Sequence, residues 1–434
     1  MKHIKLLLIV LLVLLLAFGS SPQEGLAVSQ SEAAPTGDGE IEALWYVGHL
    51  DTPGDAREVA VVGDFAYICD WGTLRIVDVS DPTTPVEVGS YSPPYGDGPC
   101  MTMAVAGNYV YTGGYYRLNI LDVTDPTAPV LAGYANGLDM PDGMAVAGAY
   151  AYVVDTHDTG SGYLYRLLIF DVSSVNNPFL ISGFTFTSGS ADVAVAGSYA
   201  YVANWDSGLR VIDVSNPYAP FEVGYYDPPG NPSGVTIAGN YAYLSESGNG
   251  LRIVDISNPT APFEVSLYHP EGYYIENSAV AWGYAYLAVN ETGVVMLNVS
   301  DPAAPIMAGL YNTPGTTHDV AVANGYVYAA DGYNGLVILR SSFSISGYVT
   351  TGDYHPIPGV TITATGGKTA VTDAAGAYVF NDMLPETYTL TAAKEGYDFT
   401  PGSLVVTLPP NAIGKNFTGE RLITRVFLPG ILFR

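Results

Sequence analysis

The sequence predicts an all-β protein: a seven-bladed β-propeller followed by a small prealbumin-like β-sandwich. Three observations support this fold. A segment of the type Leu-Arg-Ile-Val-Asp-Val-Ser-Asp-Pro recurs seven times, at steps of 42 to 49 residues. The 49 Gly and 30 Pro suit many tight turns rather than long helices. The period stops at Arg340, where a different alternating pattern begins. Repeats of about 42 residues with short alternating strands are typical of propellers, because single units cannot bury both faces of their sheet.

The chain begins with the pattern of a secretory signal peptide. Lys2 and Lys5 precede an unbroken apolar run from Leu6 to Phe18, and small residues follow it. We expect a Sec signal peptide over residues 1–27 and a disordered spacer over residues 28–40, which are rich in Ser, Ala, Gly and Glu. The apolar run is slightly short for an uncleaved membrane anchor. The mature protein is therefore expected to be secreted or on the cell surface of a bacterium, with no integral membrane span.

Each repeat divides into four strands separated by Gly, Gly-Asp and Asp-Pro turns. The first strand of most copies is small and apolar (Ala-Val-Ala), which suits the crowded centre of a propeller. The seventh copy has only three strands, but residues 45–54 match the fourth-strand segment 221–230 almost position by position. The sequence therefore predicts that the N-terminal strand closes the last blade of a propeller over residues 41–340. In the first copy the strands are expected at residues 59–63, 65–69, 74–79 and 86–91.

These repeats resemble the LVIVD repeat family, whose name is nearly spelled by residues 74–78 and 251–255, both LRIVD. The resemblance implies a propeller in secreted or cell-surface bacterial and archaeal proteins, and it brings no catalytic residues. The Asp that ends the motif recurs in blade after blade. We therefore expect it to bind turn backbone within its own blade rather than a ligand.

A second module follows Arg340. Alternating β-branched residues between Asp-x-x-Gly and Pro-Gly turns indicate a small β-sandwich. The order of its motifs resembles the carboxypeptidase regulatory-like domain, which implies an accessory module over residues 343–419 and not the peptidase itself. Residues 420–434 form an apolar tail with a basic end. The sequence favours neither of two interpretations of this tail, a sorting or surface-attachment tag and a final strand. The motifs are 344–349 (SISGYV), 357–363 (IPGVTIT), 372–380 (TDAAGAYVF) and 384–390 (LPETYTL).

One face of the propeller is expected to collect acids and aromatics, because the turns between strands two and three share it with the loops that enter strand one. Aromatic rings stack on sugars or apolar side chains, and acids bind hydroxyls or calcium. For any single acid we favour the simpler role of a turn former, whereas turns do not require aromatic residues. The candidate ligand-binding residues are Asp70, Trp71, Asp155, His157, Asp158, Trp205, Asp206, Glu246, His318, Asp319, Asp331 and Tyr333.

The two cysteines, Cys69 and Cys100, are expected on adjacent blades, at the end of strand two and just before the next strand one. Both positions open onto the same face. In an exported protein a bridge can persist, so we favour a disulfide over two buried free thiols.

No zinc-binding pattern, nucleophile elbow or phosphate-cradling loop occurs in the sequence, so we assign no catalytic residue, metal site or cofactor, and leave calcium open. The net charge of −27 argues against nucleic acid and anionic membranes as partners. We expect an exported, monomeric, non-catalytic binding or scaffold protein that presents loops to a carbohydrate or protein ligand. The alternative is an extracellular hydrolase or lyase that acts on polysaccharide through carboxylates in the propeller funnel.

Overall fold

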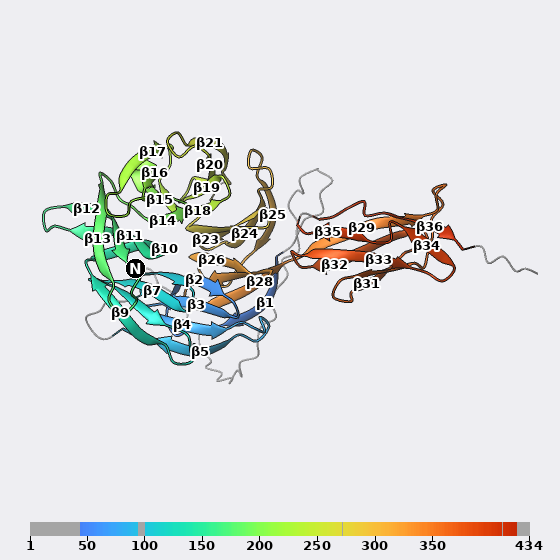
Figure 1. The fold of residues 1–434 in the computed structure, drawn as a ribbon, viewed down its shortest axis with the longest axis horizontal. Coiled ribbons are helices and arrows are strands. Elements are labelled where there is room, and N and C mark those ends of the chain that lie inside the picture. Colours follow the sequence, from blue (N-terminus) through green and yellow to red (C-terminus); the bar gives the residue numbers. More distant parts are fainter. Residues whose placement is uncertain (1–43, 94–99, 271, 410, 423–434) are drawn as a thin grey trace, which may run out of the picture. The chain divides into compact units, whose positions relative to one another are not determined.

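The computed structural model describes residues 44–93, 100–270, 272–409 and 411–422 (Figure 1). Over these ranges the chain is built from strands and contains no α-helix, the one helical turn being the 3-10 turn η1 (Trp205–Ser207). None of these segments is a helix that could cross a membrane. The expected signal peptide and spacer, residues 1–27 and 28–40, lie outside the described residues, as does most of the expected tail, 420–434.

Seven four-stranded antiparallel sheets make up the propeller within the described residues (Figure 1). Blade one holds β2 (Ala56–Val62), β3 (Phe65–Asp70), β4 (Thr73–Asp78) and β5 (Val86–Tyr91). Blade two holds β6 (Thr102–Ala106), β7 (Tyr109–Gly114), β8 (Arg117–Asp122) and β9 (Val130–Asn136). Blade three holds β10 (Met140–Ala147), β11 (Tyr150–Asp158), β12 (Tyr163–Asp171) and β13 (Phe179–Phe186).

The remaining blades follow the same order along the chain. Blade four holds β14 (Asp192–Ala196), β15 (Tyr199–Asn204), β16 (Gly208–Asp213) and β17 (Phe221–Tyr226). Blade five holds β18 (Pro232–Ala238), β19 (Tyr241–Glu246), β20 (Gly250–Asp255) and β21 (Phe263–Tyr268). Blade six holds β22 (Asn277–Ala281), β23 (Tyr284–Val289), β24 (Gly293–Asn298) and β25 (Ile306–Tyr311). Blade seven holds β26 (Asp319–Ala323), β27 (Tyr326–Ala330), β28 (Leu336–Ser341) and β1 (Leu44–Leu50).

The N-terminal strand closes the ring, as the sequence predicts. β1 pairs antiparallel with β28, so that Trp45 lies opposite Arg340 and Leu50 opposite Leu336. The first strands of neighbouring blades pack on one another all the way round, and β26 of blade seven packs on β2 of blade one. Closure leaves no blade with a missing strand.

The apolar core lies between the blades. The middle strands are almost wholly buried, whereas the innermost and outer strands are only partly buried, as β3 shows against β6 and β5. Neighbouring blades also approach closely where a glycine interrupts the fourth strand. A Cβ atom at Gly48 would lie 2.1 Å from the carbonyl oxygen of Pro82 in the next blade, and one at Gly89 would lie 2.1 Å from that of Pro126. Glycine at these positions therefore allows the close approach of the next blade.

The repeated Asp at the end of strand three binds turn backbone, as expected. Asp78 Oδ1 accepts a hydrogen bond from the backbone N–H of Ser80 at 2.9 Å. The same contact recurs at Asp122, Asp171, Asp213, Asp255 and Asn298. Hydrogen bonds from Ser80 lower the pKa of Asp78. These acids therefore build the loops before strand four and lie at the opposite end of the blades from the candidate site.

The second module is a β-sandwich of two four-stranded sheets, as predicted. β29 (Phe343–Thr350) and β36 (Phe417–Arg421) pair parallel, and the other strands pair antiparallel. Alternate residues point inward, so that Val349, Ile362, Leu390 and Phe417 are buried. One sheet has the order β32 (Ala377–Met383), β29 (Phe343–Thr350), β36 (Phe417–Arg421), β34 (Tyr397–Thr400). The other has the order β31 (Thr369–Val371), β30 (Thr361–Ala364), β33 (Thr387–Ala393), β35 (Leu404–Thr407).

Candidate functional site

The candidate residues gather at one end of the blades, which we call the upper face. It holds the turns between strands two and three and the loops that enter strand one. The two sets are neighbours because the end of strand two pairs with the start of strand one, as Asp70 pairs with Ala56. The lower face, at the other end of the blades, holds the remaining turns.

Asp70 and Asp155 end the second strand of their blades and are buried. Asp70 accepts a hydrogen bond from the backbone N–H of Gly54 at 3.1 Å, and Asp155 accepts one from the N–H of Asp139 at 2.7 Å. Each also forms an ion pair with an arginine of strand three. These two carboxylates hold the loop that enters their own blade.

Glu246 and Asp331 occupy the corresponding positions in blades five and seven and are also buried. Arg252 Nε lies 2.6 Å from Glu246 Oε1. Asp331 accepts hydrogen bonds from the backbone N–H of Gly315 at 2.8 Å and from Thr317 Oγ1 at 2.9 Å. The structure thus gives all four strand-two acids a structural role.

The remaining polar candidates of blades three and four lie at the end of β11 and in the turn η1. His157 Nδ1 lies 3.2 Å from Asp139 Oδ2, and Asp158 Oδ1 accepts a hydrogen bond from the backbone N–H of Gly160 at 2.7 Å in the hairpin tip. Asp206 accepts a hydrogen bond from Asn231 Nδ2 at 3.1 Å. His157 Nδ1 and the backbone N–H of Asp158 share Asp139 Oδ2, whereas Asp206 lies in blade four.

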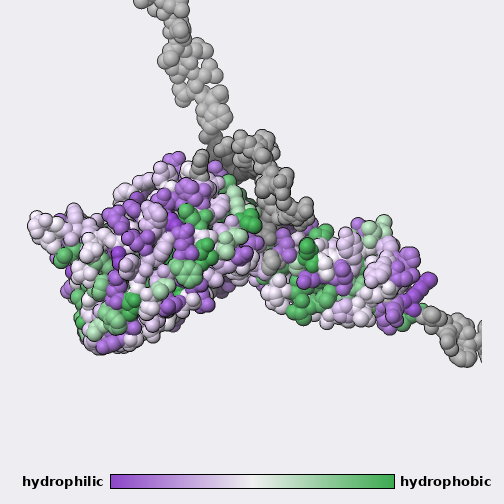
Figure 2. All heavy atoms as spheres, turned by 90° about the horizontal axis from the view of Figure 1, so that it is seen from above, coloured by the Kyte–Doolittle hydropathy of each residue, from purple (hydrophilic) through white to green (hydrophobic). Residues whose placement is uncertain are grey.

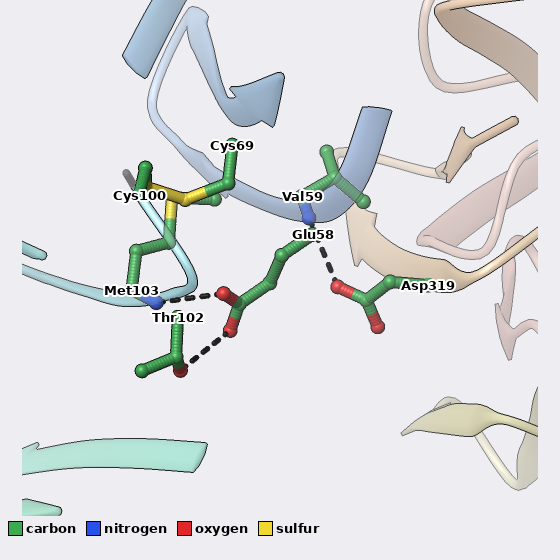
Figure 3. Close-up of a disulfide and its surroundings, with 7 residues drawn as sticks. All are labelled: Glu58, Val59, Cys69, Cys100, Thr102, Met103 and Asp319. Carbon is green, nitrogen blue, oxygen red and sulfur yellow. Dashed lines mark hydrogen bonds between the residues drawn. A yellow bond between two sulfur atoms is a disulfide. The ribbon is translucent and has the colours of Figure 1, made fainter. Parts of the chain in front are cut away.

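His318 and Asp319 lie at the inner edge of blade seven. His318 Nδ1 lies 2.7 Å from Glu276 Oε2, and this hydrogen bond raises the pKa of His318 above its ordinary value. Asp319 Oδ2 accepts a hydrogen bond from the backbone N–H of Val59 at 2.9 Å and thereby joins blade seven to blade one (Figure 3). Burial raises the pKa of Asp319 to about 7.

Two further acids at the same repeat position were not among the sequence candidates. Glu58 Oε2 accepts a hydrogen bond from the backbone N–H of Met103 in blade two at 2.6 Å (Figure 3). Asp192 Oδ2 accepts one from the N–H of Val235 in blade five at 2.9 Å. Burial raises the pKa of Asp192 to about 6 and that of Glu58 well above its ordinary value, the latter also because Asp319 is near. Both acids could have been found from the sequence, because each directly precedes the apolar residues of a strand one.

The aromatic candidates are exposed. Trp71 and Tyr333 have 67% and 71% of their surface accessible, and their ring centroids lie 6.2 Å apart with the planes tilted by 35°. They belong to the upper-face turns of blades one and seven, so the pair bridges the seam, or boundary, between these two blades. Beside them is a hollow of about 460 Å³, lined by Pro53, Gly54, Asp70, Trp71, Thr73, Arg75 and Tyr333.

Trp71 adopts a backbone conformation that its side chain does not favour. Its φ is +44°, in the left-handed region where glycine and asparagine are the usual residues. A bulky residue there costs roughly 1–2 kcal/mol relative to an extended conformation. Turn geometry alone therefore does not select tryptophan at this position.

A larger hollow, of about 690 Å³, lies on the sandwich beside Lys394, Tyr397 and Phe399 and contains none of the candidate residues. The described residues contain no group of three or more His, Cys, Asp and Glu side chains placed to hold a metal ion.

Six segments of the chain match the model of the LVIVD repeat, and together they span more than half of its length. They are residues 53–92, 97–136, 188–228, 229–269, 276–313 and 314–350. The chain belongs to the LVIVD repeat family. Residues 344–413 match the carboxypeptidase regulatory-like domain. Both resemblances stated from the motifs are thereby confirmed.

Blade three is the blade that the LVIVD repeat matches leave out. Its hairpin β11–β12 is longer than the corresponding hairpins, with Asp158 paired to Tyr163 near the tip. The sheet itself nevertheless has the same four-stranded order as the other LVIVD blades. The insertion changes the upper-face loop and leaves the blade intact.

Two solved structures are similar to this LVIVD repeat protein. The WD40 repeats of RRP9 are 11% identical, with 70% of this chain and 99% of that chain covered and a TM-score of 0.57. The computationally designed Ika8 protein is 8% identical, with 84% of this chain and 100% of that chain covered and a TM-score of 0.50. At such low identity the likeness shows the fold alone. A comparison with curated proteins finds no match.

Cys69 and Cys100 form a disulfide, with their Cα atoms 5.5 Å apart (Figure 3). Cys69 lies in β3, and Cys100 lies just before β6 of the next blade. The bridge crosses the same seam, between blades one and two, that Glu58 crosses with its hydrogen bond to Met103. A covalent and a polar contact therefore hold this seam near the upper face.

Proposed function

We propose that this protein is an exported, monomeric, non-catalytic binding protein that holds a ligand at the Trp71–Tyr333 pair of its upper face. The observation that carries the proposal is that both rings are exposed beside a hollow, on the turns of two different blades. Exposed aromatic pairs give a flat apolar surface with a polar edge, which suits the faces of sugar rings. A carbohydrate is therefore the favoured ligand, and a protein is the other candidate.

The burial of the carboxylates favours the aromatic rings, rather than charged groups, as the contacts to a ligand. The strand-two acids Asp70, Asp155, Glu246 and Asp331 are buried with partners inside the protein. A buried carboxylate that already accepts hydrogen bonds has little capacity left for a ligand hydroxyl. The aromatic side chains remain the accessible groups at the hollow.

Export is supported by the N-terminal signal pattern and by the disulfide. A bridge such as Cys69–Cys100 persists in oxidising compartments and is rare in the cytosol. In this proposal the sandwich is an accessory module that carries no activity of its own.

The test is a binding screen of the purified protein against glycan and protein arrays, with and without EDTA. Trp71→Ala and Tyr333→Ala should each lower the affinity for the ligand found by about tenfold or more, a loss of about 1.4 kcal/mol. Tyr218→Ala is the matched control, because Tyr218 is 60% exposed on a lower-face loop. Binding that neither upper-face substitution weakens would refute the site. Loss of binding in EDTA would assign calcium to it.

A second candidate, a hydrolase or lyase acting on polysaccharide, is favoured by one observation. The neighbouring acids Glu58 and Asp319 both have raised pKa values, as a proton donor requires. Each nevertheless accepts a backbone N–H of the next blade, which supports a structural role. Incubation with polysaccharides and measurement of new chain ends tests the enzyme. Cleavage by the wild type that Glu58→Gln abolishes would replace the binding proposal.

A further inference from the structure

Exposed aromatic residues recur round the upper face beyond the Trp71–Tyr333 pair. In the part of the chain that the structure describes, four of the seven turns between strands two and three carry at least one, and in blade three the exposed Tyr163 begins β12 directly after the turn. Blades five and six have small or polar residues there, such as Ser247 and Asn290. The exposed upper-face aromatics and their accessible fractions are Trp71 67%, Tyr115 40%, Tyr116 63%, Tyr163 57%, Trp205 51%, Tyr333 71% and, in the loop that enters blade six, Tyr274 58%.

The lower-face turns differ. Across the described lower-face turns and loops, Tyr218 is the exposed aromatic, at 60%, while the exposed rings of Phe179, Phe221 and Phe263 begin the outer strands at this end. Most of the turns between strands one and two consist of Gly followed by a small or polar residue, as at Gly107-Asn108 and Gly197-Ser198. In the view of Figure 2, apolar side chains of the propeller gather in separate patches among polar ones. The aromatic enrichment of the turns therefore belongs to the upper face and not to propeller turns in general.

Backbone geometry does not explain the upper-face rings. Tyr116 has a φ of +78° and Trp71 a φ of +44°, both in the left-handed region that favours glycine or asparagine. A large side chain is disfavoured at such a position. In a lower-face turn Trp282 also has a positive φ, of +54°, but it packs against the core, whereas Trp71 and Tyr116 are exposed. Neither turn conformation nor core packing therefore accounts for these two rings, which points to a role outside the fold.

The rings are placed at several stations, by which we mean groups of aromatics on one turn or seam. The first is Trp71 with Tyr333 at the seam of blades seven and one, and the second is Tyr115 with Tyr116 on blade two, their centroids 6.3 Å apart. The third lies at the seam of blades three and four. There a Cβ atom at Gly189 would lie 3.7 Å from both the Trp205 and the Tyr165 ring. A ligand that touches more than one station must be longer than the first hollow.

Charge narrows the class of ligand. The chain carries a net charge of −27. Arg75, the basic residue that lines the Trp71–Tyr333 hollow, already forms ion pairs with Asp70 and Glu87. A polyanion would meet repulsion from such a surface. Neutral sugars carry no such penalty and offer the C–H faces that stack on aromatic rings.

We propose that the upper face binds a neutral polysaccharide lengthwise, across two or more of these aromatic stations. The inference rests on the proposed function and goes beyond it in naming a neutral polymer and several contact stations. Stations that share one chain reinforce each other, because binding at the first raises the effective concentration of the chain at the second. Affinity should therefore rise with chain length beyond the length that fills the Trp71–Tyr333 hollow.

The experiment measures affinity against chain length by calorimetry. The probes are xylan, mannan and β-glucan, each with its series of oligosaccharides, and polygalacturonate as an anionic polymer. The wild type should bind a long neutral chain at least tenfold more tightly than a short oligosaccharide of the same sugar, and polygalacturonate should not bind. In Trp205→Ala that gain with length should shrink, while the affinity for the short oligosaccharide stays unchanged. Trp71→Ala should lower the affinity for the short oligosaccharide and for the long chain.

The outcomes separate this inference from the proposed function. If Trp71→Ala weakens binding at every length and Trp205→Ala at none, the single site stands and the several stations are refuted. Tighter binding of polygalacturonate than of neutral chains would overturn the neutral class. Failure of every glycan to bind would overturn both this inference and the glycan assignment of the site. Tyr218→Ala should match the wild type throughout, and thermal unfolding of Trp205→Ala shows that the substitution leaves the fold intact.

Discussion

The buried ion pair of blade five allows a sharp test of the role assigned to the strand-two acids. Arg252 is 3% exposed, and its guanidinium lies 2.6 Å from Glu246 Oε1, whose side chain is fully buried. A second carboxylate, Glu264 Oε2 on β21, lies 2.5 Å from Arg252 Nη1. Hydrogen bonds from Tyr226 and Arg252 lower the pKa of Glu264. The arginine thus ties three strands of one sheet together.

We expect Arg252→Met to lower the free energy of unfolding by about 3–5 kcal/mol, because the Glu246 carboxylate would remain buried without a counter-charge. The double substitution Arg252→Met with Glu246→Leu removes both charges and should recover most of this loss, since an apolar pair of similar volume is often neutral. The assay is equilibrium unfolding in urea, followed by tryptophan fluorescence and circular dichroism.

The repeat offers a matched control in blade four. Arg210 has the same repeat position as Arg252, but the strand-two residue is Asn204 instead of an acid. Arg210 lies 3.5 Å from the partly exposed Glu222 and 4.8 Å from the Tyr225 ring centroid. Arg210→Met should therefore lower the free energy of unfolding by no more than about 2 kcal/mol.

Two results would refute the reasoning. One is an Arg252→Met variant that loses no more stability than Arg210→Met, and the other is a double variant as unstable as the single one. Either would mean that Glu246 does not need its arginine in the folded protein. The strand-two acids would then again be candidates for ligand binding.

Four further predictions concern the ring, the disulfide, pH and the sandwich. Deletion of residues 44–50 removes the outer strand of blade seven and should lower the melting temperature sharply, whereas an unchanged melting curve would disprove closure by β1. Reduction of Cys69–Cys100 opens a loop with a sequence separation of 31 residues, so urea unfolding should show a loss of roughly 3–4 kcal/mol; an unchanged midpoint would contradict this. Asp319, with its pKa raised to about 7, retains in the folded state a proton that the unfolded chain loses near pH 4, so stability should fall as pH rises from about 4 to about 7. Asp319→Asn should flatten that part of the stability–pH curve. Residues 343–419 alone should give dispersed amide signals, and a disordered spectrum would place the boundary elsewhere.

Most of the fold could be predicted because the information is local and repeated. Each copy of the repeat carries its own turns, and its alternation of apolar residues defines the same four strands in each blade. Closure by residues 45–54 was predictable for the same reason, since that segment matches the fourth strand of another copy. Blade three was harder for a family model, because its longer hairpin interrupts the period.

The candidate site was less predictable because its chemistry depends on which strands are neighbours. The sequence around Glu246 does not show that the side chain of Arg252, six residues later on the next strand, reaches back and forms an ion pair with it. The role of Glu58 depends on a backbone N–H in the next blade, at Met103, and so on the packing of two sheets. Exposed aromatics such as Trp71 could be singled out from the sequence, because no turn requires them.

Closure of the ring by β1 also determines when the propeller can be completed. β1 is the first described strand to be synthesised, yet Leu44 pairs with Ser341, the last residue of β28. A contact between residues so far apart in the sequence forms slowly, because the chain loses the entropy of closing a large loop before the new contact stabilises it. Until then both β1 and β28 present open edges that could pair with other chains. At high concentration during refolding, the N-terminal strand of one molecule should compete for blade seven of another, and the products would be strand-swapped oligomers.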